Sequence, residues 1–196
     1  ADIDFSEISC WNKEDLARHA GDADLVWTTG SRPLLEGENL TPLTKCGAIL
    51  RSGSGTDEVD VKLATEMGII VANTPHAVAE PVADHAISLL FSLVRQVTRH
   101  DQLIRAGQWD GRLAMPGRNY KGATLGLVGF GRIPQHMVRK LSGFEMNIVA
   151  YDPYVPVEVM ASQGVKSASL DELLGTADYV SLHCPLTKNT YHLISE

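Results

Sequence analysis

Two glycines in the middle of the chain have the spacing of a phosphate-binding turn. Residues Gly126 to Met137 read GLVGFGRIPQHM, and Gly129 and Gly131 stand where an apolar strand pattern gives way to a helical one. Glycines at such a point allow a tight turn and let backbone N–H groups approach a diphosphate at the positive end of a helix. The motif usually has a third small residue, and this chain has Pro134 there.

Pro134 and a later aspartate decide how this turn is interpreted. Proline is tolerated in the first turn of a helix, where the N–H has no intrahelical partner, so we expect Pro134 to spare the phosphate site. Asp152 ends the next strand about 20 residues on, as a carboxylate that accepts ribose hydroxyls should. Such a carboxylate repels a 2′-phosphate, which favours NAD over NADP. The alternatives are a plain strand–helix turn and an Asp that starts a turn before Pro153.

The elements that must position these residues alternate between strand and helix. Apolar runs predict strands at 22–28, 48–51, 69–75, 124–128, 147–151, near 165 and at 179–183. Helical spacing predicts helices at 14–19, 57–67, 137–141, 157–163 and 170–174. A longer apolar stripe predicts one helix from about 80 to 106, with Pro81 in its first turn and Gly107 at its end. This alternation predicts an α/β fold with parallel sheets.

Composition narrows the class of protein. The chain has 196 residues, 44% apolar and 21% charged, which is typical of soluble globular proteins. Its net charge of -7 argues against nucleic-acid or anionic-membrane partners. There is no signal-peptide pattern, and no uninterrupted apolar stretch reaches the roughly 18 residues that span a bilayer. Cys10, Cys46 and Cys184 suit reduced thiols in the cytoplasm, and the seven histidines show no metal-ligand spacing, so no metal site is expected.

Several longer stretches carry a family resemblance. They are RSGSGTDEVDVKLATEMGIIVANTP, VADHAISLLFSLVRQ, GATLGLVGFGRI, VAYDPYV and DYVSLHCPLTKNTYHLI. In this order and spacing the chain resembles the D-isomer-specific 2-hydroxyacid dehydrogenases, in a C-terminal-binding-protein-like or phosphoglycerate-dehydrogenase-like branch. The resemblance implies two Rossmann-like lobes with a cleft between them. These are a partial flavodoxin-like substrate lobe, 1–95, and the first half of a doubly wound NAD-binding lobe, 96–196.

The resemblance also assigns site residues. The substrate carboxylate would lie on the loop Arg51-Ser52-Gly53-Ser54-Gly55, whose backbone N–H groups can converge on one anion. The residues assigned to substrate binding within it are Arg51, Ser52, Gly53 and Ser54. The alternative for this loop is a flexible turn. The cofactor NAD would contact Ser54, Gly129, Gly131, Arg132, Ile133, Tyr151, Asp152, Cys184 and Pro185.

The activity implied by the resemblance is hydride transfer between nicotinamide and a small 2-hydroxy or 2-oxo acid, in a homodimeric oxidoreductase. The family's catalytic arginine, glutamate and histidine follow the HLI segment. We therefore expect them beyond residue 196, in a chain shortened at both ends, and assign no catalytic residue here. Two alternatives stay open: an NAD(H)-sensing, corepressor-like interaction protein without turnover, and an inactive fragment of the dehydrogenase.

Overall fold

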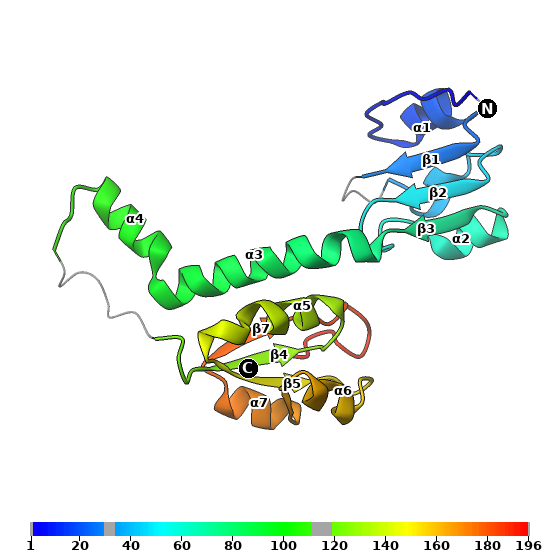
Figure 1. Cartoon of the computed structure of the whole chain (residues 1–196). Coiled ribbons are helices and arrows are strands. Elements are labelled where there is room, and N and C mark those ends of the chain that lie inside the picture. Colours follow the sequence, from blue (N-terminus) through cyan, green and yellow to red (C-terminus); the bar gives the residue numbers. More distant parts are fainter. Residues whose placement is uncertain (1, 30–33, 111–118, 196) are drawn as a thin grey trace. The chain divides into compact units, whose positions relative to one another are not determined.

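The computed structural model describes residues 2–29, 34–110 and 119–195. These form two compact units, 1–78 and 79–196, which are treated separately below (Figure 1). The long helix α3 (Pro75–Arg95) begins in the first unit, and three of its four buried side chains, Ala83, Leu90 and Val94, belong to the core of the second. The division therefore falls earlier than residue 95, and the assignment of 1–95 to a substrate lobe and 96–196 to a cofactor lobe stays a prediction.

The first unit is a parallel sheet of three strands in the order β1-β2-β3. The strands are β1 (Leu25–Thr28), β2 (Ala48–Arg51) and β3 (Ile70–Asn73), and the helices are α1 (Lys13–Ala20), α2 (Val61–Glu66) and the 3-10 helix η1 (Gly37–Leu40). Asn12 and Asp60 cap α1 and α2 with their side chains, as polar residues at these positions should. The three strands end in register at Thr28, Arg51 and Asn73, so the loops that follow them emerge at one edge.

The second unit is a parallel sheet of four strands in the order β6-β5-β4-β7. Its elements are β4 (Thr124–Val128), α5 (Arg132–Leu141), η2 (Ser142–Phe144), β5 (Asn147–Tyr151), α6 (Val157–Ser162), β6 (Lys166–Ser167), α7 (Leu170–Thr176) and β7 (Tyr179–Leu182). Figure 1 shows α3 and α5 on one face and α6 and α7 on the other, which is a doubly wound arrangement. The strand order reverses between β4 and β7, and ligands of such sheets bind at the carboxyl ends of the strands beside that point.

The predicted helix from 80 to 106 is wrong, because the chain forms two helices there. α3 ends at Arg95, Gln96 takes a left-handed φ of 52°, and α4 (Val97–Arg105) follows. The apolar spacing continues across this break, so periodicity gives no signal of a single left-handed residue. Pro81 lies inside α3 rather than in its first turn, because the helix already begins at Pro75. Gly107 follows the end of α4 with a φ of 70°, as expected.

α3 is long and apolar enough, by length and composition, to cross a membrane, and a single such helix is weak evidence for a span. Its apolar composition has another physical source in this structure. Ala83, Leu90 and Val94 are buried in the core of the second unit. Lys140 of α5 forms ion pairs with Glu80 at 2.9 Å and Asp84 at 2.6 Å. These contacts identify α3 as a packing helix of the α/β unit.

Candidate functional site

Gly129 begins the turn after β4 in a conformation that requires glycine. Its φ is 94°, and its N–H donates to the Tyr151 carbonyl at 2.8 Å. A Cβ at this position would lie 2.9 Å from the backbone nitrogen of Cys184 and 3.0 Å from the carbonyl carbon of His183. The end of β7 therefore packs directly on the glycine turn, as close as only a glycine permits.

The N-terminus of α5 presents a group of unpaired backbone donors. Within the described residues, nothing accepts a hydrogen bond from the N–H groups of Gly131, Arg132 and Ile133, and no side chain caps the helix. Pro134 has no N–H, and the first helical bond runs from Gln135 N–H to the Gly131 carbonyl at 3.3 Å. Proline is thus accommodated as expected. A Cβ on Gly131 would meet no atom within 4 Å, so no protein atom fills the space beside the turn at this residue. Open donors at a helix N-terminus are available to a ligand.

Asp152 stands beside this turn at the carboxyl end of β5. One carboxylate oxygen, Oδ2, accepts the Phe130 N–H at 2.8 Å, and Oδ1 accepts the Tyr154 N–H at 2.9 Å. Each oxygen keeps a second lone-pair direction, so the carboxylate can also accept two hydroxyl groups of a ribose. The residue that was predicted for ribose is therefore beside the turn that was predicted for phosphate.

The chain after β7 forms the third side of this site. His183 N–H donates to the Val128 carbonyl at 2.8 Å, which fixes the segment against β4. The His183 ring nitrogen Nε2 lies 2.8 Å from Ser181 Oγ, and burial lowers the pKa of His183, which favours the neutral imidazole. Cys184 is partly buried with a free thiol, and Pro185 is exposed. The predicted Cys184 thus adjoins Gly129, and the predicted Pro185 is the next residue along the chain.

In the first unit, some backbone N–H groups of the loop after β2 donate hydrogen bonds within the protein, and others have no acceptor among the described residues. Ser52 N–H donates to the Thr28 carbonyl at 3.0 Å, and Gly53 N–H donates to Thr74 Oγ1 at 2.9 Å. Among the residues that the structure describes, nothing accepts a hydrogen bond from the N–H groups of Ser54 and Gly55. Of the predicted loop residues, Ser54 has a donor available for an anion. Gly55, the last residue of the predicted loop, has the second open donor.

The side chain of Arg51 is committed to its own loop. Its Nη2 lies 3.0 Å and 3.1 Å from the two carboxylate oxygens of Glu58, and the side chains are 15% and 13% exposed. The guanidinium also donates to the Ser52 carbonyl. Trp27 donates its indole N–H to Ser52 Oγ at 2.7 Å. Arg51 and Ser52 therefore hold the loop in shape. The structural role of the Arg51 side chain becomes visible only in its pairing with Glu58, because that contact depends on how the loop folds.

Within residues 2–29, 34–110 and 119–195, no three His, Cys, Asp or Glu side chains are grouped so that they could hold a metal ion. The site in the second unit instead combines three open N–H groups, a helix N-terminus and one carboxylate. An anionic diphosphate and a ribose are the groups that this donor and acceptor set fits. The fold and the site together define a dinucleotide-binding α/β protein.

Comparison with known proteins identifies the family. Residues 87–196 match the family model described as "D-isomer specific 2-hydroxyacid dehydrogenase, NAD binding domain". The match covers more than half of the chain, so the chain belongs to the D-isomer-specific 2-hydroxyacid dehydrogenase family and includes its NAD-binding domain. This confirms the family resemblance, the expected α/β fold with a Rossmann-like NAD-binding domain, and the NAD prediction.

Individual relatives cover most of this chain. It is 39% identical over 184 residues to a D-3-phosphoglycerate dehydrogenase of Methanocaldococcus jannaschii, which spans 93% of this chain and 34% of that protein. It is 36% identical to a glyoxylate reductase of Korarchaeum cryptofilum, over 97% of this chain and 60% of that protein. A D-lactate dehydrogenase structure from Aquifex aeolicus, complexed with NAD and lactic acid, has a TM-score of 0.79 and 29% identity, covering 91% and 53%. The chain thus spans between a third and three fifths of these relatives.

Proposed function

We propose that this chain supplies the cofactor site and the carboxylate-binding loop of an NAD-dependent oxidoreductase that acts on a small 2-hydroxy or 2-oxo acid. The observation that carries the proposal is the set of three open N–H groups at the start of α5, next to the Asp152 carboxylate. The named relatives act on phosphoglycerate, glyoxylate or lactate, which supports a 2-hydroxy acid as the substrate class.

Each part of the cofactor has a partner in the proposed site. The N–H groups of Gly131, Arg132 and Ile133 bind the diphosphate, and the exposed Arg132 guanidinium adds a positive charge. Asp152 accepts the hydroxyls of the adenosine ribose and repels a 2′-phosphate. Tyr151, Cys184 and Pro185 line the remaining sides. Bound NADH supplies the hydride that reduces C2 of a 2-oxo acid.

The substrate carboxylate is proposed to lie on the N–H groups of Ser54 and Gly55. Two adjacent backbone donors match the two oxygens of a carboxylate and hold it in a fixed direction. Arg51, Ser52 and Gly53 hold the loop through the contacts described above. No described residue is assigned the proton transfer to the substrate oxygen.

Steady-state oxidation of NADH by the intact gene product tests the proposal. Glyoxylate, hydroxypyruvate and phosphohydroxypyruvate are the substrates to compare, with NADPH as the matched control cofactor. We expect turnover with at least one of these acids and a preference for NADH of at least about a hundredfold, a factor that corresponds to roughly 2.7 kcal/mol. Binding of NADH without oxidation by any 2-oxo acid would instead support the cofactor-sensing alternative.

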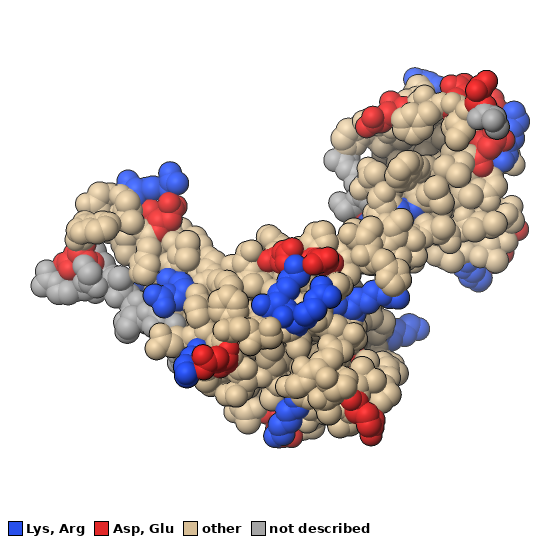
Figure 2. All heavy atoms as spheres, viewed as in Figure 1, with Lys and Arg blue, Asp and Glu red and all other residues tan. Residues whose placement is uncertain are grey.

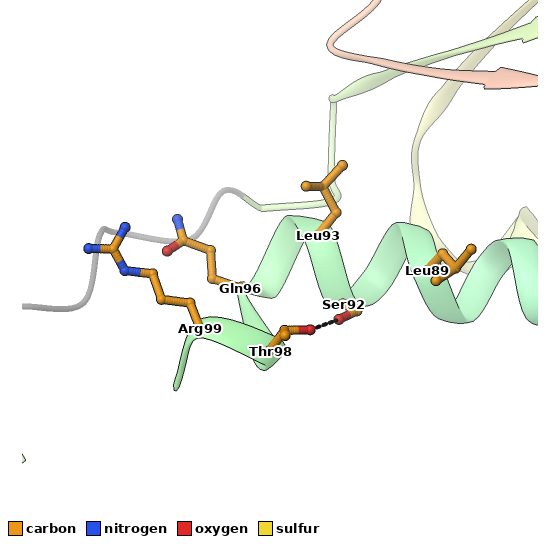
Figure 3. Close-up of a pocket in the computed structure, with 6 residues that line it drawn as sticks. All are labelled: Leu89, Ser92, Leu93, Gln96, Thr98 and Arg99. Atoms are coloured by element: carbon orange, nitrogen blue, oxygen red, sulfur yellow. Dashed lines mark hydrogen bonds between the residues drawn. The ribbon is translucent and has the colours of Figure 1, made fainter. Parts of the chain in front are cut away.

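A second copy of this chain is the proposed partner of α3 and α4. Leu89, Leu93, Val97 and Ile104 are each more than half exposed, and α4 buries none of its nine residues. A helix this short is not stable alone in water, so it needs a surface to pack on. A hollow of about 460 Å³ lies at the junction of the two helices. Its lining side chains are drawn in Figure 3, among them Ser92 and Thr98, whose Oγ and Oγ1 atoms lie 3.2 Å apart. Closed twofold dimers are the commonest way to cover such a face.

The oligomeric state tests this part of the proposal. Sedimentation should give a dimer for the parent and a monomer for Leu93→Asp, which places a charge in the apolar face. Lys62→Asp, which changes an exposed side chain of α2 in the first unit, is the control and should stay dimeric. A monomeric parent, or a dimeric Leu93→Asp variant, would contradict the assignment of this face.

A cytoplasmic location and the absence of nucleic-acid and membrane partners belong to the same proposal. Figure 2 shows acidic and basic side chains close to one another on the visible face. The net charge of -7 and the free thiols of Cys10, Cys46 and Cys184 are consistent with an acidic protein in a reducing compartment. Cofloatation with anionic vesicles should be undetectable at physiological salt.

A further inference from the structure

Phe130 is the only side chain of the turn between Gly129 and Gly131, and it is held at three points. Its ring is fully buried in the core of the second unit. Its carbonyl accepts a hydrogen bond from the Gln135 side-chain amide at 3.1 Å. Its N–H donates to Asp152 Oδ2 at 2.8 Å, which is a charge-assisted bond. The turn is therefore fixed by contacts that exist before any ligand arrives.

The bond from Phe130 to Asp152 fixes the peptide plane that joins Gly129 to Phe130. Gly129 has no Cβ to restrict its backbone, so without this bond the plane is freer to rotate and to bring a carbonyl oxygen toward the diphosphate. The second oxygen of Asp152 is itself anchored by the Tyr154 N–H at 2.9 Å, which orients the carboxylate. The open N–H groups of Gly131, Arg132 and Ile133 follow immediately after this fixed plane.

We propose that Asp152 is a positioning residue for the diphosphate site as well as the acceptor for the adenosine ribose. This inference rests on the cofactor site of the proposed function. The Asp152 carboxylate then acts on two parts of the cofactor. It contacts the adenosine ribose directly, and it orients the turn that binds the diphosphate. A consequence is that substitutions of Asp152 intended to admit NADP weaken diphosphate binding for both cofactors.

The test separates ribose binding from positioning of the turn by combining an altered ligand with an altered protein. Binding of NADH and of an NADH analogue without the adenosine 2′- and 3′-hydroxyls is measured by calorimetry for the intact parent and for Asp152→Ala. The analogue has no hydroxyl for Asp152 to bind, so only the turn can transmit the substitution. We expect the variant to bind the analogue about tenfold more weakly than the parent does, because a turn without this bond must be ordered again when the diphosphate binds.

Equal affinity of parent and variant for the analogue, within about twofold, would overturn the inference and leave the proposed function intact. A parent that does not bind NADH would overturn the proposed function itself. Asp178→Ala is the matched control, because Asp178 Oδ2 accepts the Thr124 N–H at 2.9 Å at the opposite end of β4. This control should lower stability and leave the affinity for both ligands unchanged.

Amide hydrogen exchange of the cofactor-free parent tests the same contact without a variant, in case Asp152→Ala does not fold. The Phe130 amide should exchange at least about a hundredfold more slowly than the Gly131 amide, because only the first donates to an acceptor in the protein. Comparable exchange at the two positions would contradict the role given to Asp152. Asp152→Asn, which keeps one acceptor oxygen, should show intermediate protection.

Discussion

The two glycines of the turn differ in what they are needed for, and alanine substitutions should separate the two needs. Gly129 has a φ of 94° and no room for a methyl group, because backbone atoms of His183 and Cys184 lie about 3 Å from the ideal Cβ position. Gly131 has an ordinary φ of −76° and open space within 4 Å of that position. Gly129 is thus required by the fold, and Gly131 by the ligand.

The magnitude for Gly129→Ala follows from two contributions. Holding a non-glycine residue in this backbone region costs about 1–3 kcal/mol. Forcing a methyl group against packed backbone adds about 1–3 kcal/mol, since neither neighbour is the flexible end of a side chain. The free energy of unfolding should fall by at least about 2 kcal/mol, which lowers the melting temperature by roughly 8 °C for a unit of this size.

Gly131→Ala should show the reverse pattern. Its melting temperature should stay within about 4 °C of the parent value, because alanine at a helix N-cap costs at most about 1 kcal/mol relative to glycine. Its affinity for NADH should fall at least about tenfold, because the methyl group occupies the space over the open N–H groups. Differential scanning calorimetry and NADH titration on both variants measure the two effects. An unchanged melting temperature in Gly129→Ala, or unchanged NADH affinity in Gly131→Ala, would refute the reasoning.

Three further outcomes are expected. Pro134→Gly should bind NADH within about threefold of the parent by fluorescence titration, since proline removes no helical hydrogen bond there; a hundredfold change would show otherwise. Glu58→Gln should lower the free energy of urea unfolding by about 3 kcal/mol, because it leaves the Arg51 charge unpaired and mostly buried, and a loss below about 1 kcal/mol would contradict this. Because burial lowers the pKa of His183 in the folded state, stability is complete above the unfolded pKa of about 6.5 and falls as the pH drops below it; this decline should disappear in His183→Gln.

Much of the fold follows from local pattern. Strands β2, β4 and β5 have the predicted bounds, and the predicted helices α1, α5, α6 and α7 are all present, because each is marked by apolar spacing and by capping or glycine signals within a few residues. The break at Gln96 was missed since one left-handed residue leaves the spacing unchanged. The start of α3 at Pro75 was missed because Pro81 offered a more obvious first turn.

The sequence by itself determined the chemical types at the cofactor site. Two glycines before a helix and an aspartate after the next strand are local features, and their order along the chain predicts where a diphosphate and a ribose bind. Only the tertiary structure decided which of the charged and hydrogen-bonding groups already have a partner within the protein. Arg51 is paired by Glu58, Gly53 N–H is taken by Thr74, and Asp152 is already bonded to the turn. These contacts join segments up to 22 residues apart, so they depend on how strands and loops meet in space, which spacing along the chain does not encode.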